Sequence, residues 1–70
     1  GIAAPLLAAT ERAMRANGAR DAELHCVVGN DRARRFYERC GWRCQGEIHE
    51  EIETLRGTAA IPFWQMVKSL

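Results

Sequence analysis

The sequence predicts one small α/β (α+β) domain in which two helices pack on a sheet. Apolar residues recur at helical spacing in two separate stretches, and an alternating, β-branched stretch lies between them. The last third of the chain contains two extended stretches around a glycine. The order helix, strand, helix, strand, strand indicates helices packed on a mixed sheet. Because the chain has only 70 residues, it holds at most one domain with a small core.

The first helix is predicted from Pro5 to Asn17. Proline suits the first turn of a helix, and Leu7 and Met14 lie on one apolar face. The charged side chains, Glu11 among them, are expected on the opposite face in water. Asn17 and Gly18 tolerate the left-handed conformation that ends helices, so the helix should stop there.

A strand is predicted from Ala22 to Val28, where Leu24 and Cys26 alternate with Glu23 and His25. This pattern is typical of a strand that is covered on one face. The strand is expected to keep one unpaired edge, because the chain supplies few neighbours for it.

The second helix begins after Gly29, where Asn30 or Asp31 is suited to cap it. Its apolar stripe falls at positions i, i+3, i+4 and i+7, and Gly41 ends it. The stripe consists of Ala33, Phe36, Tyr37 and Cys40.

A β-hairpin is predicted in the remainder, with extended stretches from Trp42 to Leu55 and from Ile61 to Lys68. The segment "RGTAA" between them supplies a glycine for the turn. The aromatic residues Phe63 and Trp64 are expected to pack on half-buried strands.

Composition narrows the class of protein. The net charge is +1, with 10 Lys and Arg against 9 Asp and Glu, so charge alone does not favour nucleic acid or membrane partners. The apolar opening "GIAAPLLAAT" is too short to span a bilayer. Three cysteines are too few for a disulfide framework, and Cys40 and Cys44 lack zinc-knuckle spacing. We therefore expect a soluble, cytoplasmic protein with no metal site.

The second helix and its flanks carry a family resemblance. The positions that match the pattern N-x-x-A-x-x-F-Y-x-x-x-G-[FW] are Asn30, Ala33, Phe36, Tyr37, Gly41 and Trp42. This pattern resembles that of the GNAT superfamily of acetyl-CoA-dependent N-acetyltransferases. The opening Gly1-Ile2-Ala3 is similar to the last three positions of the family's R/Q-x-x-G-x-G/A loop, and "ETLRGTAAIPFWQMVKSL" is similar to its closing hairpin.

The resemblance covers essentially the whole chain and implies a partial GNAT fold. In that fold several strands and helices precede the acetyl-CoA loop. Residues 1–70 are therefore expected to form a single partial domain, the C-terminal half of an acetyltransferase. The missing segments would pair with the unpaired strand.

The resemblance also implies acetyl-CoA as co-substrate and an amine-bearing acceptor. Backbone N–H groups at the start of a helix favour a pyrophosphate, and the expected cradle is Gly1, Ile2, Ala3 and Ala4. Pro5 has no N–H to offer there. Along the second helix, the implied coenzyme A contacts are Asn30, Ala33, Phe36 and Tyr37. Local sequence alone favours a simple helix cap for Asn30, whereas the resemblance favours a bond to the pantetheine arm.

Tyr37 is the candidate general acid. Acyl transfer from a thioester expels a thiolate, and a phenol that donates a proton to the departing sulfur assists the reaction. The alternative is an amphipathic aromatic at the edge of the apolar stripe, with its hydroxyl in water.

The acceptor amine must lose a proton, because a free alkylamine is mostly charged at neutral pH. Acidic residues and His49 lie along the first hairpin strand, and Glu50 is the candidate base because it shares a face with Ile48 and Ile52. Most of these acids are equally typical of a solvated edge strand. Water or an acid of the missing half is the other candidate.

Two alternatives remain open at this stage. The chain is either catalytically incomplete, assembling with a second copy or an N-terminal half through its unpaired strand, or a small basic-helix nucleic-acid binder. The second alternative depends on Arg32, Arg34, Arg35 and Arg39. Asp31 and Glu38 interrupt that patch, and some of these arginines are equally suited to the phosphates of coenzyme A.

Overall fold

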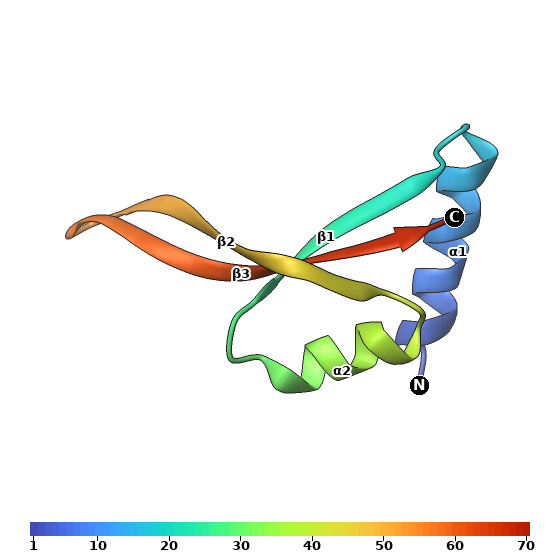
Figure 1. The fold of residues 1–70 in the computed structure, drawn as a ribbon, viewed down its shortest axis with the longest axis horizontal. Helices are drawn as coiled ribbons and strands as arrows, with labels where there is room; N and C mark the ends of the chain where they lie inside the picture. Colours follow the sequence, from blue (N-terminus) through green and yellow to red (C-terminus); the bar gives the residue numbers. More distant parts are fainter.

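A computed structural model describes all residues, 1–70, and contains two helices and three strands (Figure 1). Along the chain the elements are α1 (Ala3–Ala16), β1 (Asp21–Val27), α2 (Asp31–Arg39), β2 (Arg43–Thr54) and β3 (Gly57–Ser69). The two helices and the single sheet confirm the α+β class.

The sheet has the order β1-β3-β2, and both pairings are antiparallel. The prediction of a mixed sheet is therefore wrong for this chain. The reason is that β3 turns back from β2 and inserts between β2 and β1. The two strands that run parallel to each other are thus never neighbours, and each keeps one free edge.

Helix α1 begins at Ala3, two residues earlier than predicted, because Pro5 occupies the first turn rather than the first position. It ends as expected at Asn17, and Gly18 has a φ of +91°. The prediction that Glu11 faces water is wrong. Its side chain is buried, with a relative exposure of 6%.

The hairpin turn is tighter than predicted. Strand β3 begins at Gly57, so the connection is Leu55 and Arg56 rather than "RGTAA". The Thr54 hydroxyl donates to the Gly57 carbonyl oxygen at 2.6 Å, and the Arg56 N–H donates to Thr54 Oγ1 at 3.3 Å. Because Gly57 has a φ of +117°, the turn needs a glycine at the start of β3.

Both helices contribute to the core on one face of the sheet. The buried apolar residues are Ala22, Cys26, Trp42 and Met66. Residues from both helices, including Leu7 and Tyr37, pack against this cluster. The opposite face of the sheet has no helix over it, so the molecule has two layers.

The molecule is extended for its length. In Figure 1 the far half of the β2–β3 hairpin projects away from the helices as a two-stranded arm. The radius of gyration is 14.0 Å, whereas a compact chain of this length has about 11 Å. The exposed surface is 5276 Å², compared with about 4,400 Å² for a compact monomer of this mass. The chain therefore leaves an unusually large share of its sheet uncovered.

Candidate functional site

A hollow of about 450 Å³ lies between the start of α1 and one side of α2. Its lining residues are Ala3, Asn30, Arg32, Ala33, Phe36, Tyr37 and Arg39. Five of the eight residues predicted to contact coenzyme A thus line one hollow. The other three, Gly1, Ile2 and Ala4, do not line it, although they adjoin Ala3 in the chain. The hollow forms because α2 runs back beneath the sheet and brings its last turn near the start of α1 (Figure 1).

Asn30 is the N-cap of α2. Its side-chain oxygen accepts a hydrogen bond from the Ala33 N–H at 3.2 Å, which satisfies one of the free donors at the helix start. The carboxamide nitrogen has no hydrogen-bond partner in the chain. One side chain can therefore cap the helix with its oxygen and donate into the hollow with its nitrogen.

The start of α1 has no side-chain cap. Ile2 occupies the N-cap position, and the first turn contains no acidic residue. The N–H groups of Ala3 and Ala4 therefore keep their hydrogen-bonding capacity at the positive end of the helix dipole, whereas Pro5 in the same turn has no N–H. Such a helix start accommodates an anion better than a capped one does.

Tyr37 is half-buried between two aromatic rings. Its ring centroid lies 5.4 Å from that of Phe36 and 6.3 Å from that of Trp42, both edge-on. No group in the chain makes a hydrogen bond with its hydroxyl. A phenol in this setting is held by its ring while its oxygen is free to act on a ligand in the hollow.

The four arginines of α2 do not form one patch. Arg32 and Arg39 line the hollow. Arg34 instead lies over the Trp64 ring, 4.6 Å from its centroid, and its Nε is 3.7 Å from Glu38 Oε2. Arg35 is exposed. This division weakens the case for a DNA-reading helix, which requires its basic side chains on one surface.

Glu50 lies on the bare face of the sheet, whereas Tyr37 packs on the helical face. His25 of β1 lies between two carboxylates, with Nδ1 at 2.9 Å from Glu50 Oε1 and Nε2 at 2.9 Å from Glu23 Oε2. Gln65 of β3 donates to the other oxygen of Glu23 at 2.8 Å. The structure therefore does not bring Glu50 to Tyr37. It joins Glu50 to a histidine instead.

This cluster shifts the protonation of its members. Carboxylates only accept hydrogen bonds, so both ring nitrogens of His25 must donate, which is the charged imidazolium. The hydrogen bond to Glu23, together with Glu50, raises the pKa of His25. The hydrogen bonds from His25 and Gln65 lower the pKa of Glu23. The sequence showed only alternating polar residues here, and the strand register needed to pair them could not be read from it.

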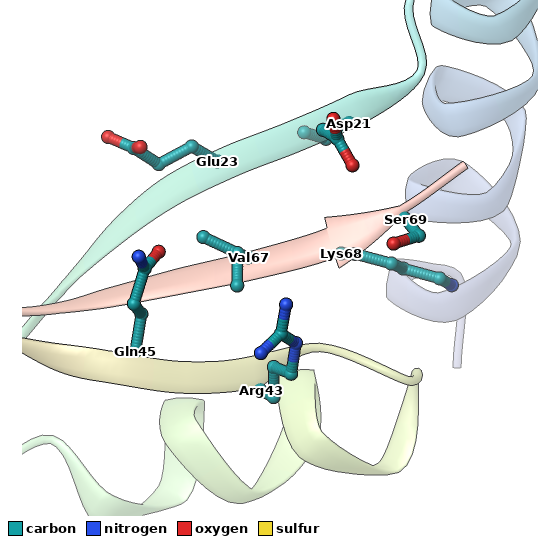
Figure 2. A pocket seen from close by; sticks show the side chains of 8 residues that line it. Asp21, Glu23, Arg43, Gln45, Val67, Lys68 and Ser69 are labelled. Atoms are coloured by element: carbon teal, nitrogen blue, oxygen red, sulfur yellow. The ribbon is translucent and has the colours of Figure 1, made fainter.

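A second hollow of about 410 Å³ adjoins this cluster near the start of β1. Figure 2 shows Asp21 and Glu23 of β1 on one side of Val67, and Arg43 of β2 on the other, with the guanidinium turned toward β3. Lys68 points the other way, toward α1. The hollow is shallow and polar, and no ion pair joins Arg43 to either acid.

The buried Glu11 forms an ion pair with the half-buried Lys68, a contact that the sequence does not predict. Lys68 Nζ lies 2.6 Å from Glu11 Oε1, and it also donates to the Cys40 carbonyl oxygen at 2.6 Å. The Trp42 indole N–H donates to Glu11 Oε2 at 3.1 Å. Burial raises the pKa of Glu11, but the bonds from Lys68 and Trp42 outweigh it and lower the net pKa. No local pattern in the sequence indicates this pair, because Glu11 and Lys68 lie near opposite ends of the chain.

Comparisons with known proteins give one finding. The model of the acetyltransferase (GNAT) family matches residues 1–42, which is more than half of the chain. No curated protein and no solved structure gave a significant match. Neither helix has the length and apolar character needed to cross a bilayer. No group of three or more His, Cys, Asp or Glu side chains is arranged to hold a metal ion.

Proposed function

The chain belongs to the GNAT family of acetyltransferases, and from that membership we propose that it forms the C-terminal half of an N-acetyltransferase domain that moves an acetyl group from acetyl-CoA to an amine. The observation that carries the proposal is the hollow between α1 and α2. It collects Ala3, Asn30, Ala33, Phe36 and Tyr37 on one surface.

These residues fit the parts of coenzyme A. The uncapped start of α1 offers N–H groups to the pyrophosphate. The free carboxamide nitrogen of Asn30 offers a donor to an amide oxygen of the pantetheine arm. The small side chain of Ala33 leaves room for that arm beside α2. Arg32 and Arg39, at the rim of the same hollow, supply positive charge for phosphates.

In the proposed reaction the amine nitrogen forms a bond to the acetyl carbonyl carbon, and the carbon–sulfur bond breaks. Tyr37 donates its phenolic proton to the departing sulfur, and the nitrogen gives up a proton to a base. General acid catalysis of this kind contributes about 10²–10⁴-fold to the rate. The reaction thus converts a thioester and an amine into an amide and a thiol.

Water in the hollow, or an acid of the N-terminal half, is proposed as the base that accepts the amine proton. Glu50 lies on the bare face of the sheet with its Oε1 bound to His25, and the sheet separates it from the hollow that Tyr37 lines. We also propose a cytoplasmic location, since a reducing compartment suits the three free thiols.

Isothermal titration of the chain with acetyl-CoA tests the proposal. We expect saturable binding that Arg32→Gln weakens, because Arg32 lines the hollow. Arg35→Gln is the matched control on the same helix, since Arg35 is exposed and lies outside the hollow. The proposal fails if the chain binds no acetyl-CoA, or if both substitutions weaken binding equally.

Measurement of turnover then tests the role of Tyr37 as the general acid. Tyr37→Phe keeps the ring between Phe36 and Trp42 and removes only the proton donor. We expect kcat to fall by about 10²-fold or more, with acetyl-CoA affinity retained. Unchanged turnover across the pH range would remove Tyr37 from the mechanism.

A second candidate function rests on the uncovered sheet. In this alternative the chain is catalytically silent alone and acts as an assembly module. A second copy, or an N-terminal half on another chain, pairs with the free edge of β1 and covers the bare face. The large radius of gyration and the apolar residues of that face, such as Val27 and Ile52, favour it.

A further inference from the structure

Glu11 is the only buried charged residue of the chain, and the proposed reaction does not use it. It lies in the middle of α1, away from the hollow. An acid that is removed from water must be compensated by partners on every side that faces protein. Each of its two oxygens has one, because Lys68 approaches Oε1 and the Trp42 indole N–H approaches Oε2.

The contacts continue from Trp42 to Tyr37. The two ring centroids are 6.3 Å apart with an interplanar angle of 67°, so one ring edge rests on the other ring. The Trp42 backbone N–H also donates to the Tyr37 carbonyl oxygen at 3.0 Å. An indole that is fixed at its nitrogen by Glu11 therefore packs against the ring of Tyr37, which lines the hollow.

Lys68 fixes the same region from the other side. Its ammonium group binds both Glu11 of α1 and the carbonyl oxygen of Cys40 at the end of α2. One cation thus ties together the two helices whose facing surfaces form the hollow. Loss of Glu11 releases the Trp42 indole and also leaves Lys68 with only one of its two partners.

We propose that Glu11 is a positioning residue, which acts through the Trp42 indole to hold Tyr37 in its orientation in the hollow. The catalytic importance of that orientation rests on the proposed function. The contacts between Glu11, Trp42 and Tyr37 do not depend on a ligand. Glu11 touches no substrate. The hydrogen bond from the indole nitrogen transmits its effect to the Tyr37 ring, whereas the ion pair with Lys68 holds α1 to the end of α2.

Three variants separate this role from simple stabilisation. Glu11→Gln keeps an oxygen that can accept from Trp42 but loses the ion pair. Glu11→Leu combined with Lys68→Met replaces the pair by apolar groups, which generally preserves stability, but leaves the indole without an acceptor. Leu24→Ala weakens the same core and leaves all these hydrogen bonds intact, so it reports what instability alone does.

The ring resonances of Tyr37 give a readout without activity, since it is the only tyrosine in the chain. The resonances depend on the position of the neighbouring indole. We expect the double variant to shift them, and Glu11→Gln and Leu24→Ala to leave them close to wild type. Trp42→Phe, which removes the indole N–H, should shift them whatever residue stands at position 11.

Turnover provides the second readout. With the same variants, we expect the double variant to lower kcat by about tenfold while KM for acetyl-CoA stays within about twofold, a loss equivalent to about 1.4 kcal/mol. Leu24→Ala should lower the melting temperature and leave kcat unchanged.

Two results would overturn the positioning role. One is a folded double variant with wild-type Tyr37 resonances. The other is a Glu11→Gln variant that shifts them as far as the double variant does, because the charge rather than the hydrogen bond would then matter. If wild type binds no acetyl-CoA, the proposed function fails, whereas the resonance comparison still decides the role of Glu11.

Discussion

Gly41 lies between α2 and β2, next to the side chain of Lys68. Its φ of +93° is a conformation that L side chains rarely adopt. A Cβ at this position would lie 3.3 Å from both Cε and Nζ of Lys68. The backbone conformation therefore favours glycine here, and a Cβ would in addition press on the end of the half-buried Lys68 side chain.

Gly41→Ala should lower the free energy of unfolding by roughly 1–3 kcal/mol, the usual cost of a residue held in a sparsely populated backbone region. Urea denaturation measures the change. Gly46→Ala is the matched control, because a Cβ at Gly46 would meet no atom within 4 Å and its φ is not positive. Equal effects of the two substitutions would contradict this account.

Asn30 combines two roles that substitutions can separate. Asn30→Ala removes the cap and should lower the free energy of unfolding by about 1 kcal/mol. Asn30→Ser retains a side-chain oxygen for the Ala33 N–H but has no carboxamide nitrogen. We expect the serine variant to keep wild-type stability in urea denaturation and to lose acetyl-CoA affinity in titration. Wild-type affinity in the serine variant would leave Asn30 as a cap alone.

At the scale of elements, the cluster around His25 joins all three strands on the bare face. His25 of β1 binds Glu50 of β2, and Gln65 of β3 donates to Glu23. The hydrogen bonds bridge β1 and β2, which are not neighbours in the sheet. The charged imidazolium is therefore part of what holds the arm of the hairpin to β1.

Stability should fall as the pH rises through the folded-state pKa of His25. That pKa is raised above the ordinary value of 6.5 by the carboxylates, so the contribution is fully present below 6.5 and is lost above the folded value. Urea denaturation between pH 5 and about pH 9 measures it. His25→Gln should remove the dependence, whereas His49→Gln, at an exposed histidine, should keep it. A pH dependence that is the same in both variants would exclude the cluster as its cause.

Much of the secondary structure could be predicted from the sequence. The stripe of α2, the Asn30 cap and the alternation of β1 all follow from local spacing, and the structure confirms them. The turn at Leu55 and Arg56 could not be predicted, because it lacks the Asn-Gly or Asp-Gly pair that marks tight hairpins. Pro62 made the full length of β3 harder to predict, because proline has no N–H for a sheet hydrogen bond. It is tolerated because the paired residues of β1 and β3 end at Phe63. Beyond that point the Val28 N–H donates to the Pro62 carbonyl oxygen, which needs no N–H from the proline.

The parts of the site that sequence missed depend on contacts between distant residues. The pairing of Glu11 with Lys68 and of His25 with Glu50 is set by strand register and helix rotation, which local patterns do not encode. The hollow was predictable only through the family pattern. Helical spacing placed its α2 residues on one side, but nothing local placed Ala3 beside them.

At the scale of the whole molecule, the helical face and the bare face have different energetics. The helical face holds the small core around Met66, which is completely buried. The bare face leaves apolar side chains of β1 and of the hairpin in water. Ile52 has a relative exposure of 39% and Val27 of 46%. Covering these side chains would add hydrophobic stabilisation at about 25 cal/mol per Å² of buried apolar surface.

If a second copy covers that face, the stability of the chain depends on its concentration. Anything that binds only the folded state stabilises it by mass action, so the melting temperature should rise as the chain concentration is increased. We expect light scattering to give a mass near that of two chains at the upper end of the series. Ile52→Lys should abolish both effects by placing a charge on the bare face. Leu55→Lys, at the fully exposed tip of the turn, should abolish neither. A concentration-independent melting temperature with the mass of one chain would exclude the second copy and leave an N-terminal half as the remaining cover.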